Sequence, residues 1–310
     1  MPTSTQDHEV TPVPVTGSCE ETSSAGRKHI CVCIPSYKRP EPLKRLLTSL
    51  SCQNTAGRFT YSIVIVDNAS SDDSRILAAT HDNVIFHALE RNVGFGAACN
   101  IGARVATTPY LFFLNPDARL GEGTLEALIA ADLMQDGTNA FNPRIVDDAG
   151  HIFVRSPAKF SPLRSSFSKV APTGDCALAV LSGSAIFLRR SLFAELGGFD
   201  ENIFLYFEDD DLSIRLAEWD VGLRHVHGAV IRHSGGISTA PSRHLTHFKN
   251  YHWMQSSIYC ARKHGMPASI PSLLLKSSLR WLLAAASLDK ERSAKYAGRV
   301  SALWQEAMQT

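Results

Sequence analysis

Short apolar runs alternate with amphipathic segments through the first half of the chain. Residues 29–34 are apolar and end at Pro35, which is typical of a buried strand in a parallel sheet. The leucines that follow recur with the spacing of a helix face, at positions 43, 46, 47 and 50. The alternation continues with strands expected at 61–66, 84–89 and 110–114. Helices are expected at 72–80 and 94–105. A further helix is expected from Thr124, which can cap it, to residue 133. This order predicts an α/β fold whose mostly parallel sheet is covered on both faces.

The pattern changes in the second half. Apolar residues 177–188 are interrupted by Ser182-Gly183-Ser184, and the chain becomes helical in pattern from Leu245. The further elements expected are a helix at 209–219, one or two strands at 222–231, and amphipathic helices at 270–288 and 295–308. The change near residue 240 predicts a helical C-terminal appendage. Residues 1–27 have no periodicity and are expected to be a disordered tail.

Composition narrows the class of protein. The 310 residues include 31 Lys and Arg and 30 Asp and Glu, which gives a net charge of +1. Nucleic-acid-binding proteins usually carry a clear excess of basic residues, so this balance argues against that class. With 44% hydrophobic and 20% charged residues the chain can build a sizeable core. Seven cysteines without a CxxC motif are atypical of a secreted disulfide framework. Residues 1–29 lack the apolar core of a signal peptide, so we expect a cytoplasmic protein.

Polar residues follow three of the expected strands. Tyr37 and Arg39 come after the first, Asp67 after the second and Asp117 after the fourth. In open α/β sheets ligands bind at these carboxyl ends. An aromatic ring can stack on a nucleobase, a cation can face a diphosphate, and a carboxylate can accept from a ribose hydroxyl. An Asx turn with a helix cap explains residues 67–70 equally well, so both interpretations stay open there.

Asn115-Pro116-Asp117 after the fourth strand is a second candidate. A carboxylate at a strand end can hold a divalent cation that also binds diphosphate oxygens. Asn-Pro also begins turns, so a simple turn stays open. The nearby loop Arg91–Gly96 resembles a phosphate-binding glycine loop. It lacks the GxGxxG spacing of nicotinamide-binding proteins, and the chain has no GxxxxGK[ST] motif.

Four consecutive carboxylates, Glu208 to Asp211, follow the aromatic residues 204–207 and open a helix. Mutual repulsion and neighbouring apolar surface can raise the pKa of one of them enough for it to act as a base. The alternative is a solvated helix N-terminus that the helix dipole favours. His233 ends a strand, where a single histidine is more often structural than a ligand.

Six segments together resemble the family 2 glycosyltransferases with the GT-A fold, which are inverting enzymes, and in particular their rhamnosyltransferase-like branch. The resemblance spans residues 30 to 260, and the segments come in the family's order. They are CVCIPSYKRPEPLKRLLTSL (31–50), IVIVDNASSDDS (63–74), RNVGFGAACNIGARVA (91–106), YLFFLNPDARL (110–120), GGFDENIFLYFEDDDLSIRL (197–216) and VHGAVIRHSGGIS (226–238). The resemblance implies a Rossmann-like sheet flanked by helices, with a nucleotide-sugar-binding half at 28–120, an acceptor-binding half at 121–240 and a helical region at 241–310.

The resemblance also implies roles for individual residues. Asn115-Pro116-Asp117 takes the place of the family's DxD motif, with Asn115 for its first Asp, so Asp117 is the expected ligand of Mg²⁺ or Mn²⁺ and His233 completes metal or diphosphate contacts. Asp209 is the expected catalytic base, with Glu208 and Asp211 as alternatives on the acceptor side. The expected nucleotide-sugar-binding residues are Pro35, Tyr37, Arg39, Asp67, Asn92, Gly94, Asn100, Asn115 and Asp117.

The function implied is transfer of a sugar from a nucleoside-diphosphate sugar, such as dTDP-L-rhamnose, to a hydroxyl of a glycan or polyprenyl-diphosphate-linked acceptor in surface polysaccharide assembly. One alternative is a nucleotidyltransferase on a similar sheet, whose GxGTRL-like loop the chain lacks. Another is a non-catalytic carbohydrate-binding relative, against which Asp117, Asp209 and His233 argue.

The expected helix at 270–288 has one face formed by Leu275, Leu279, Leu282 and Leu283, with Lys276 beside it. An apolar face flanked by basic residues suits the interface of an anionic membrane. It also suits packing on the catalytic domain or on a second subunit as a homodimer. Pro271, Lys276 and Arg280 interrupt the segment, which argues against a spanning helix. Peripheral binding to the inner face of the cell membrane is therefore one hypothesis.

Overall fold

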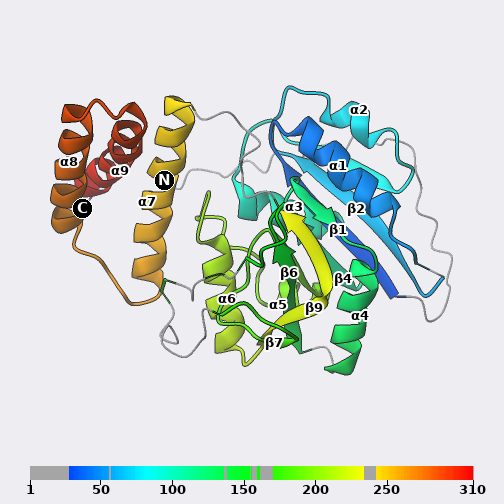
Figure 1. Ribbon diagram of the computed structural model, residues 1–310. Coiled ribbons are helices and arrows are strands. Elements are labelled where there is room, and N and C mark those ends of the chain that lie inside the picture. Colours follow the sequence, from blue (N-terminus) through cyan, green and yellow to red (C-terminus); the bar gives the residue numbers. More distant parts are fainter. Residues whose placement is uncertain are drawn as a thin grey trace, which may run out of the picture.

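A computed structural model describes residues 28–55, 57–135, 138–153, 155, 159–160, 170–233 and 242–309 (Figure 1). The expected disordered tail at 1–27 and the expected domain boundary near residue 240 lie outside these residues.

The first half forms the parallel part of the sheet. Its four strands have the spatial order β3-β2-β1-β4, and each pairs in parallel with its neighbours. The expected strands are confirmed as β1 (Lys28–Ser36), β2 (Phe59–Asp67), β3 (Val84–Ala88) and β4 (Tyr110–Leu114). The connecting helices are α1 (Pro40–Ser51), α2 (Ser74–Ala78) and α3 (Phe95–Val105).

The second half extends this sheet with antiparallel pairs, so the complete sheet is mixed. β8 pairs antiparallel with β4 and β6, β9 runs parallel to β6, and β5 and β7 pair antiparallel with β9. These strands are β5 (Ala118–Leu120), β6 (Asn139–Val146), β7 (Cys176–Ala177), β8 (Ala185–Arg189) and β9 (Gly222–His233). The helices of this half are α4 (Thr124–Met134), α5 (Arg190–Glu195) and α6 (Glu208–Glu218).

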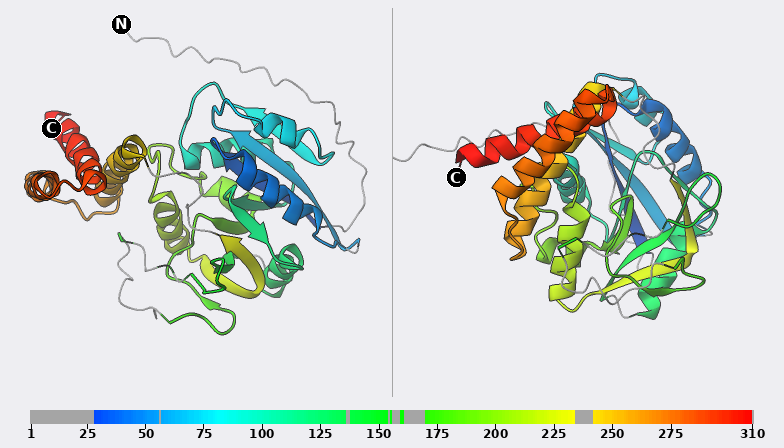
Figure 2. Two further views of the ribbon diagram at one scale, coloured as in Figure 1. Left: turned by 45° about the horizontal axis from the view of Figure 1, so that its top comes forward. Right: turned by 60° about the vertical axis from the view of Figure 1, so that its left-hand side comes forward.

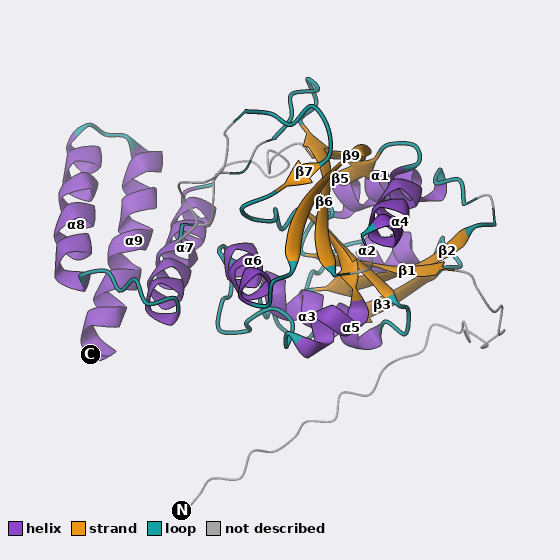
Figure 3. Cartoon of the chain, turned by 90° about the horizontal axis from the view of Figure 1, so that it is seen from below, coloured by secondary structure: helices purple, strands orange, loops and turns teal. Residues whose placement is uncertain are grey.

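Helices cover the sheet on two faces, with α1, α2 and α4 on one and α3, α5 and α6 on the other (Figure 3). A hydrophobic core lies on each face of the sheet, and successive residues of β1 point into one core and then the other. Ile30 and Val32 pack with the leucines of α1, whereas Cys31 and Cys33 pack with residues of α3 and α6. Both cores are buried, which explains why the strand is apolar at almost every position.

Thr124 is not the cap of α4, contrary to the sequence prediction. Gly123 holds the N-cap position in a left-handed conformation, and no side chain caps the helix. Thr124 Oγ1 lies 2.9 Å from the carbonyl oxygens of Gly121 and Val230, and it accepts from the Val230 N–H. Its hydroxyl therefore fastens the start of α4 to β9.

Three helices follow the α/β layers, as the pattern predicted: α7 (Arg243–Lys263), α8 (Ile270–Ala286) and α9 (Lys290–Gln309). They stand beside the sheet, with α9 between α7 and α8 and α8 on the far side (Figure 2). Met254 and Ile258 of α7 pack with Ala302 and Leu303 of α9 in a small separate core. None of the described helices is long and apolar enough to cross a membrane.

A buried carboxylate joins these helices to the α/β layers. Asp211 of α6 accepts from Arg215 Nε at 2.8 Å and also contacts two groups at the end of α7, Lys263 Nζ at 2.7 Å and His264 Nε2 at 2.9 Å. Because the Asp211 side chain is fully buried, these partners replace the water it gives up on folding. The contact fixes the C-terminal end of α7 against α6.

Candidate active site

Three polar residues meet where β5 pairs with β9. The antiparallel register sets Ala118 opposite His233, so the turn before β5 carries Asn115 and Asp117 to the end of β9. His233 Nε2 lies 3.1 Å from Asp117 Oδ1 and 3.2 Å from Asn115 Nδ2. The structure therefore brings together three residues that the sequence assigned to one cation and diphosphate site.

The surroundings keep Asp117 ionised. Burial opposes its ionisation, but the hydrogen bond from His233 and the charges of His233 and Arg39 outweigh burial and lower the pKa of Asp117. The side chains of Asp117 and His233 are 11% and 17% exposed, so both remain accessible to a ligand. Carboxylate and imidazole are ligands for Mn²⁺, and Mg²⁺ prefers the carboxylate.

A divalent cation fits this pair only with help from a substrate. Among the described residues, no group of three or more His, Cys, Asp or Glu side chains is placed to hold a metal ion. Asp117 and His233 would therefore supply two ligands, and phosphate oxygens and water the others. Mg²⁺ is commonly bound in this way, through one or two carboxylates and substrate phosphates.

The residues after β1 add a cation and an accessible ring. Arg39 is the N-cap residue of α1, and its buried Nη1 has no hydrogen-bond partner among the described residues. Tyr37 is 41% exposed, so its ring can stack on a planar ligand. Pro35 is buried within β1 opposite Val66, where it shapes the backbone. Lys38 Nζ lies 5.1 Å from the centre of the Tyr37 ring, which adds a second cation here. Cationic groups close in sequence to an exposed ring suit an anionic ligand with a planar ring.

Asp67 ends β2 at the same edge of the sheet, beside Ser36 at the end of β1. Its carboxylate accepts from the Ser70 N–H at 3.2 and 3.3 Å, which is the Asx turn that the sequence left open. Burial raises the pKa of Asp67, and the hydrogen bonds from Ser70 oppose that shift. The turn is present, and the carboxylate still lies at the strand-end edge.

Asn68, whose role the sequence did not identify, braces the loop after β3. Its Nδ2 donates to the Gly94 carbonyl at 3.0 Å, and its Oδ1 accepts from the Val93 N–H at 2.8 Å. Asn92 Oδ1 accepts from the Gly94 N–H at 3.0 Å. Gly94 has φ +93°, and a Cβ there would lie 2.3 Å from the Phe204 carbonyl oxygen, so only glycine fits. Asn92 and Gly94 thus shape the loop beside the site.

The structure gives Asn100 a different role from the predicted contact with ribose and diphosphate. Its Nδ2 donates to the Phe199 carbonyl at 2.9 Å and to Glu201 Oε1 at 3.0 Å, and its Oδ1 accepts from the Phe199 N–H at 2.9 Å. These bonds use both amide hydrogens and the amide oxygen inside the protein. Asn100 therefore joins α3 to the loop before α6 and has no donor left for a nucleotide.

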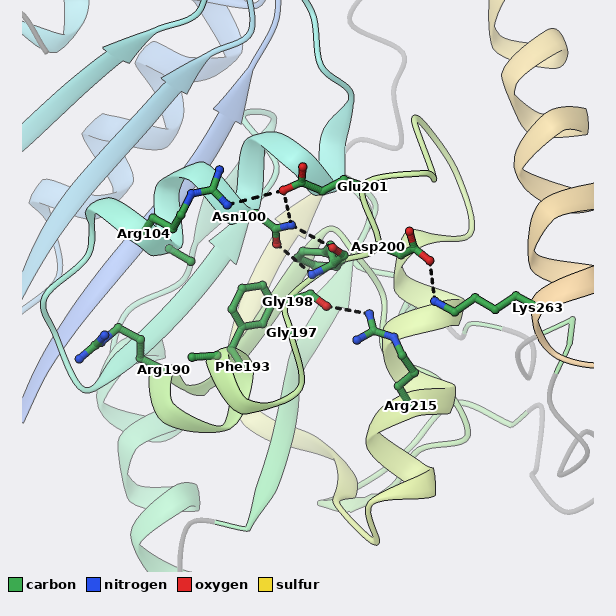
Figure 4. A pocket seen from close by; sticks show the side chains of 13 residues that line it. Asn100, Arg104, Arg190, Phe193, Gly197, Gly198, Asp200, Glu201, Arg215 and Lys263 are labelled. Atoms are coloured by element: carbon green, nitrogen blue, oxygen red, sulfur yellow. Dashed lines mark hydrogen bonds and ion pairs between the residues drawn. The ribbon is translucent and has the colours of Figure 1, made fainter. Parts of the chain in front are cut away.

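Asn100 also lines a pocket of about 790 Å³ that contains none of Asp117, Asp209 or His233 (Figure 4). Most of its charged side chains are paired within the protein, Lys263 with Asp200 and Arg104 with Glu201. The pocket is therefore separate from the charged residues at the strand ends.

Asp209 lies at the start of α6 with its two oxygens in different environments. Its Oδ2 is paired with Arg155 and accepts from the Gly183 N–H at 2.7 Å. Its Oδ1 accepts only from the Asp210 N–H, at 3.0 Å, among the described residues. Arg155, which also pairs with Asp210, stands in a segment without a motif, so nothing in the sequence indicated this contact. A carboxylate that is held in place through Oδ2, and whose Oδ1 has one hydrogen bond among the described residues, can accept a proton on Oδ1.

The two alternative bases are less suited to that task. Burial, and after it the charge of Asp209, raises the pKa of Glu208 to about 8, so Glu208 is mostly protonated at neutral pH. Its buried Oε2 has no hydrogen-bond partner among the described residues. Asp211 is fully buried and bound by Arg215, Lys263 and His264, which join α6 to α7. The geometry therefore favours Asp209 over Glu208 and Asp211.

Comparison with known proteins gives a consistent result. The family described as Glycosyl transferase family 2 matches residues 31–197. The chain is 29% identical over 280 residues to the N-acetylglucosaminyl-diphospho-decaprenol L-rhamnosyltransferase of Mycobacterium tuberculosis, covering 80% of this chain and 87% of that protein. It is 28% identical over 218 residues to the pre-mycofactocin glycosyltransferase of the same species, covering 68% of this chain and 44% of that protein.

Solved structures share the fold at low sequence identity. GalNAc-T7 with UDP, GalNAc and Mn²⁺ has a TM-score of 0.56 and 16% identity, covering 79% of this chain and 55% of that chain. S. aureus TarS 1-349 has a TM-score of 0.52 and 14% identity, covering 91% of this chain and 92% of that chain. These likenesses confirm the predicted GT-A fold.

The first prediction concerns Glu208 and pH. In the unfolded chain Glu208 ionises near pKa 4.5, whereas in the folded chain its pKa is about 8. Between these values only the unfolded state loses the proton, so wild type loses stability as pH rises. We expect Glu208→Gln to remove this loss. The free energy of unfolding of the variant, relative to that of wild type, should therefore increase as pH rises, by up to about 1.4 kcal/mol per pH unit.

Urea unfolding of both proteins at about pH 5, 6.5 and 8 measures this difference. Glu218→Gln, an exposed residue of the same helix, is the matched control, and its free energy of unfolding should fall as pH rises, as that of wild type does. A difference between Glu208→Gln and wild type that stays constant across the three pH values contradicts a raised pKa at Glu208.

Proposed function

Since the chain belongs to glycosyl transferase family 2, we propose that it is an inverting, metal-dependent transferase that moves L-rhamnose from dTDP-L-rhamnose to a lipid-linked glycan in surface polysaccharide assembly. The observation that carries this proposal is the group of Asp117, His233 and Arg39 at the strand ends, where Arg39 Nη1 has no partner among the described residues. The similarity to the mycobacterial L-rhamnosyltransferase supports the choice of sugar and acceptor. Its name specifies an N-acetylglucosaminyl-diphospho-decaprenol substrate.

The donor site uses the residues that follow β1, β2 and β4. Tyr37 stacks on the base, and the Asp67 carboxylate accepts from it. Arg39 faces the diphosphate, where its buried Nη1 gains the hydrogen-bond partner that the described residues do not supply. Asp117 and His233 hold Mg²⁺ or Mn²⁺, which when bound neutralises charge on the leaving diphosphate.

Asp209 is the catalytic base in this proposal. Its Oδ1 accepts the proton of the acceptor hydroxyl, while Arg155 and the Gly183 N–H hold Oδ2 in place. The acceptor oxygen forms a bond to the anomeric carbon as the bond to the diphosphate breaks, and Arg39 neutralises the charge that develops. A single displacement from the opposite face inverts the anomeric configuration, and no protein carboxylate is needed as a nucleophile.

An exposed apolar face on α8 supports the proposal that the acceptor is linked to a lipid. Leu275, Leu279, Leu282 and Leu283 are 72%, 57%, 57% and 62% exposed, because α8 packs on α9 through its other side. The alternative that this stripe packs on the catalytic domain is therefore wrong. With Lys276 exposed next to it, the face suits the interface of an anionic membrane at the inner side of the cell envelope.

The second prediction tests the base. We expect Asp209→Asn to lower sugar transfer by about 10²–10⁴-fold, because an amide cannot take the proton, while affinity for dTDP is unchanged. Transfer of radiolabelled rhamnose to a polyprenyl-diphosphate acceptor and calorimetry with dTDP measure the two effects. Glu218→Gln on the same helix is the control. Retention of more than about a tenth of wild-type transfer by Asp209→Asn rules out this role.

The third prediction concerns the metal. We expect EDTA to weaken binding of dTDP to wild type, because a cation held by Asp117 would offset the negative charge of the diphosphate. The Asp117→Ala variant should bind dTDP weakly with or without Mn²⁺. Calorimetry with and without the metal gives both affinities, and Asp82→Ala, an exposed carboxylate in a turn, should behave like wild type. An affinity of wild type that EDTA leaves unchanged refutes metal dependence.

The fourth prediction concerns the membrane. We expect the full chain to sediment with anionic liposomes, and the variant Leu279→Glu/Leu282→Glu to remain in the supernatant, because charge on the exposed face opposes insertion. Neutral phosphatidylcholine liposomes are the control, and they should bind wild type less. If wild type stays in the supernatant with anionic lipid, membrane docking is wrong and pairing of two subunits through this face is the better account.

A further inference from the structure

The first half of α7 lies against the edge of the candidate active site. The Phe204 ring stacks on His252 with centroids 4.2 Å apart and meets Phe248 edge-on at 6.0 Å. The Phe204 carbonyl accepts from the Phe95 N–H at 3.0 Å, next to the glycine of the loop after β3. One side of α7 and that loop thus share Phe204 as a common contact.

Lys249 lies on this part of α7, one residue after Phe248 and three before His252. The side chain is partly buried, and among the described residues it makes no hydrogen bond or ion pair. The charged groups that act on it are Arg39 and Asp117. Burial and, after it, the charge of Arg39 lower the pKa of Lys249, while Asp117 opposes the shift. A lysine from the C-terminal helices therefore lies within electrostatic range of the strand-end residues.

Neither Arg39 nor Lys249 forms an ion pair with a carboxylate among the described residues. Within the part of the chain that the structure describes, Arg39 Nη1 is buried without a hydrogen-bond partner, and Asp117 is paired with His233. Burial and the charge of Arg39 act against the positive charge of Lys249, and the attraction of Asp117 offsets them only in part. A bound anion that contacts both cations would stabilise their charges. An anion with at least two negative charges balances Arg39 and Lys249, and a diphosphate carries that charge.

We infer that Lys249 contacts the donor's diphosphate together with Arg39, so that α7 completes the donor site from outside the α/β layers. This inference rests on the proposed function, in which the donor is a nucleoside-diphosphate sugar. It gives the C-terminal helices a role in donor binding in addition to any contact of α8 with lipid. In the reaction, Lys249 stabilises negative charge on the departing diphosphate.

The experiment uses inorganic pyrophosphate, which needs no knowledge of the base or sugar. Calorimetry on the full chain in EDTA at low ionic strength isolates the contribution of the protein's own cations. We expect wild type to bind pyrophosphate, Lys249→Gln to bind about tenfold more weakly, and Lys249→Arg to retain most of the affinity. Lys276→Gln, an exposed lysine on α8, should match wild type. Thermal unfolding of each variant shows that it is folded.

Two results overturn the inference: equal affinity of wild type and folded Lys249→Gln for pyrophosphate, or no binding of pyrophosphate to wild type. Sugar transfer by wild type is assayed separately, so failure of the proposed function can be distinguished from failure of the role of Lys249. Active wild type with unchanged pyrophosphate affinity in Lys249→Gln leaves the proposed function intact and removes the role of Lys249. Inactive wild type with Lys249-dependent binding leaves the anion site intact and removes the proposed function.

Discussion

The antiparallel pairing of β5 with β9 is the contact on which the candidate site depends. It joins Asn115 and His233, which lie 118 residues apart in the chain. β5 has only three residues, so its own ladder bonds are few. Thr124 strengthens the junction by bonding the start of α4 to Val230 within β9. The geometry of the Asp117 and His233 pair is therefore supported by the helix that follows β5.

The four carboxylates at the start of α6 show how tertiary partners separate residues that are chemically alike. Asp209 Oδ2 contacts Arg155 and a backbone N–H, so the carboxylate is held in one orientation. Asp211 is enclosed by Arg215, Lys263 and His264 and joins α6 to α7. Glu208 is buried beside Asp209, and its pKa is raised to about 8. One run of acidic residues thus supplies an oriented carboxylate, a structural cross-link and a protonated acid.

The C-terminal helices are connected to the α/β layers at two places. The Asp211 cross-link holds the end of α7, and the aromatic contacts of Phe204 hold its first half. The second of these contacts lies beside the loop that Gly94 permits to pass close to the Phe204 carbonyl. Since α7 is anchored at both ends, Lys249 is held near Arg39 and Asp117, while α8 remains outermost with its leucines exposed.

The sequence by itself determined the order of strands and helices and the strand-end position of Tyr37, Arg39, Asp67 and Asp117. Periodicity and strand-end chemistry are local properties, and a run such as residues 110–114 is buried in any parallel sheet. Only the tertiary structure decided that the side-chain amide of Asn100 bonds the backbone of Phe199. It decided, too, that Gly123, and not Thr124, holds the N-cap position of α4. It also decided that Arg155 and Lys249 lie near the site. Those outcomes depend on contacts between segments far apart in the chain, and neither the spacing nor the type of a residue specifies which distant group meets it.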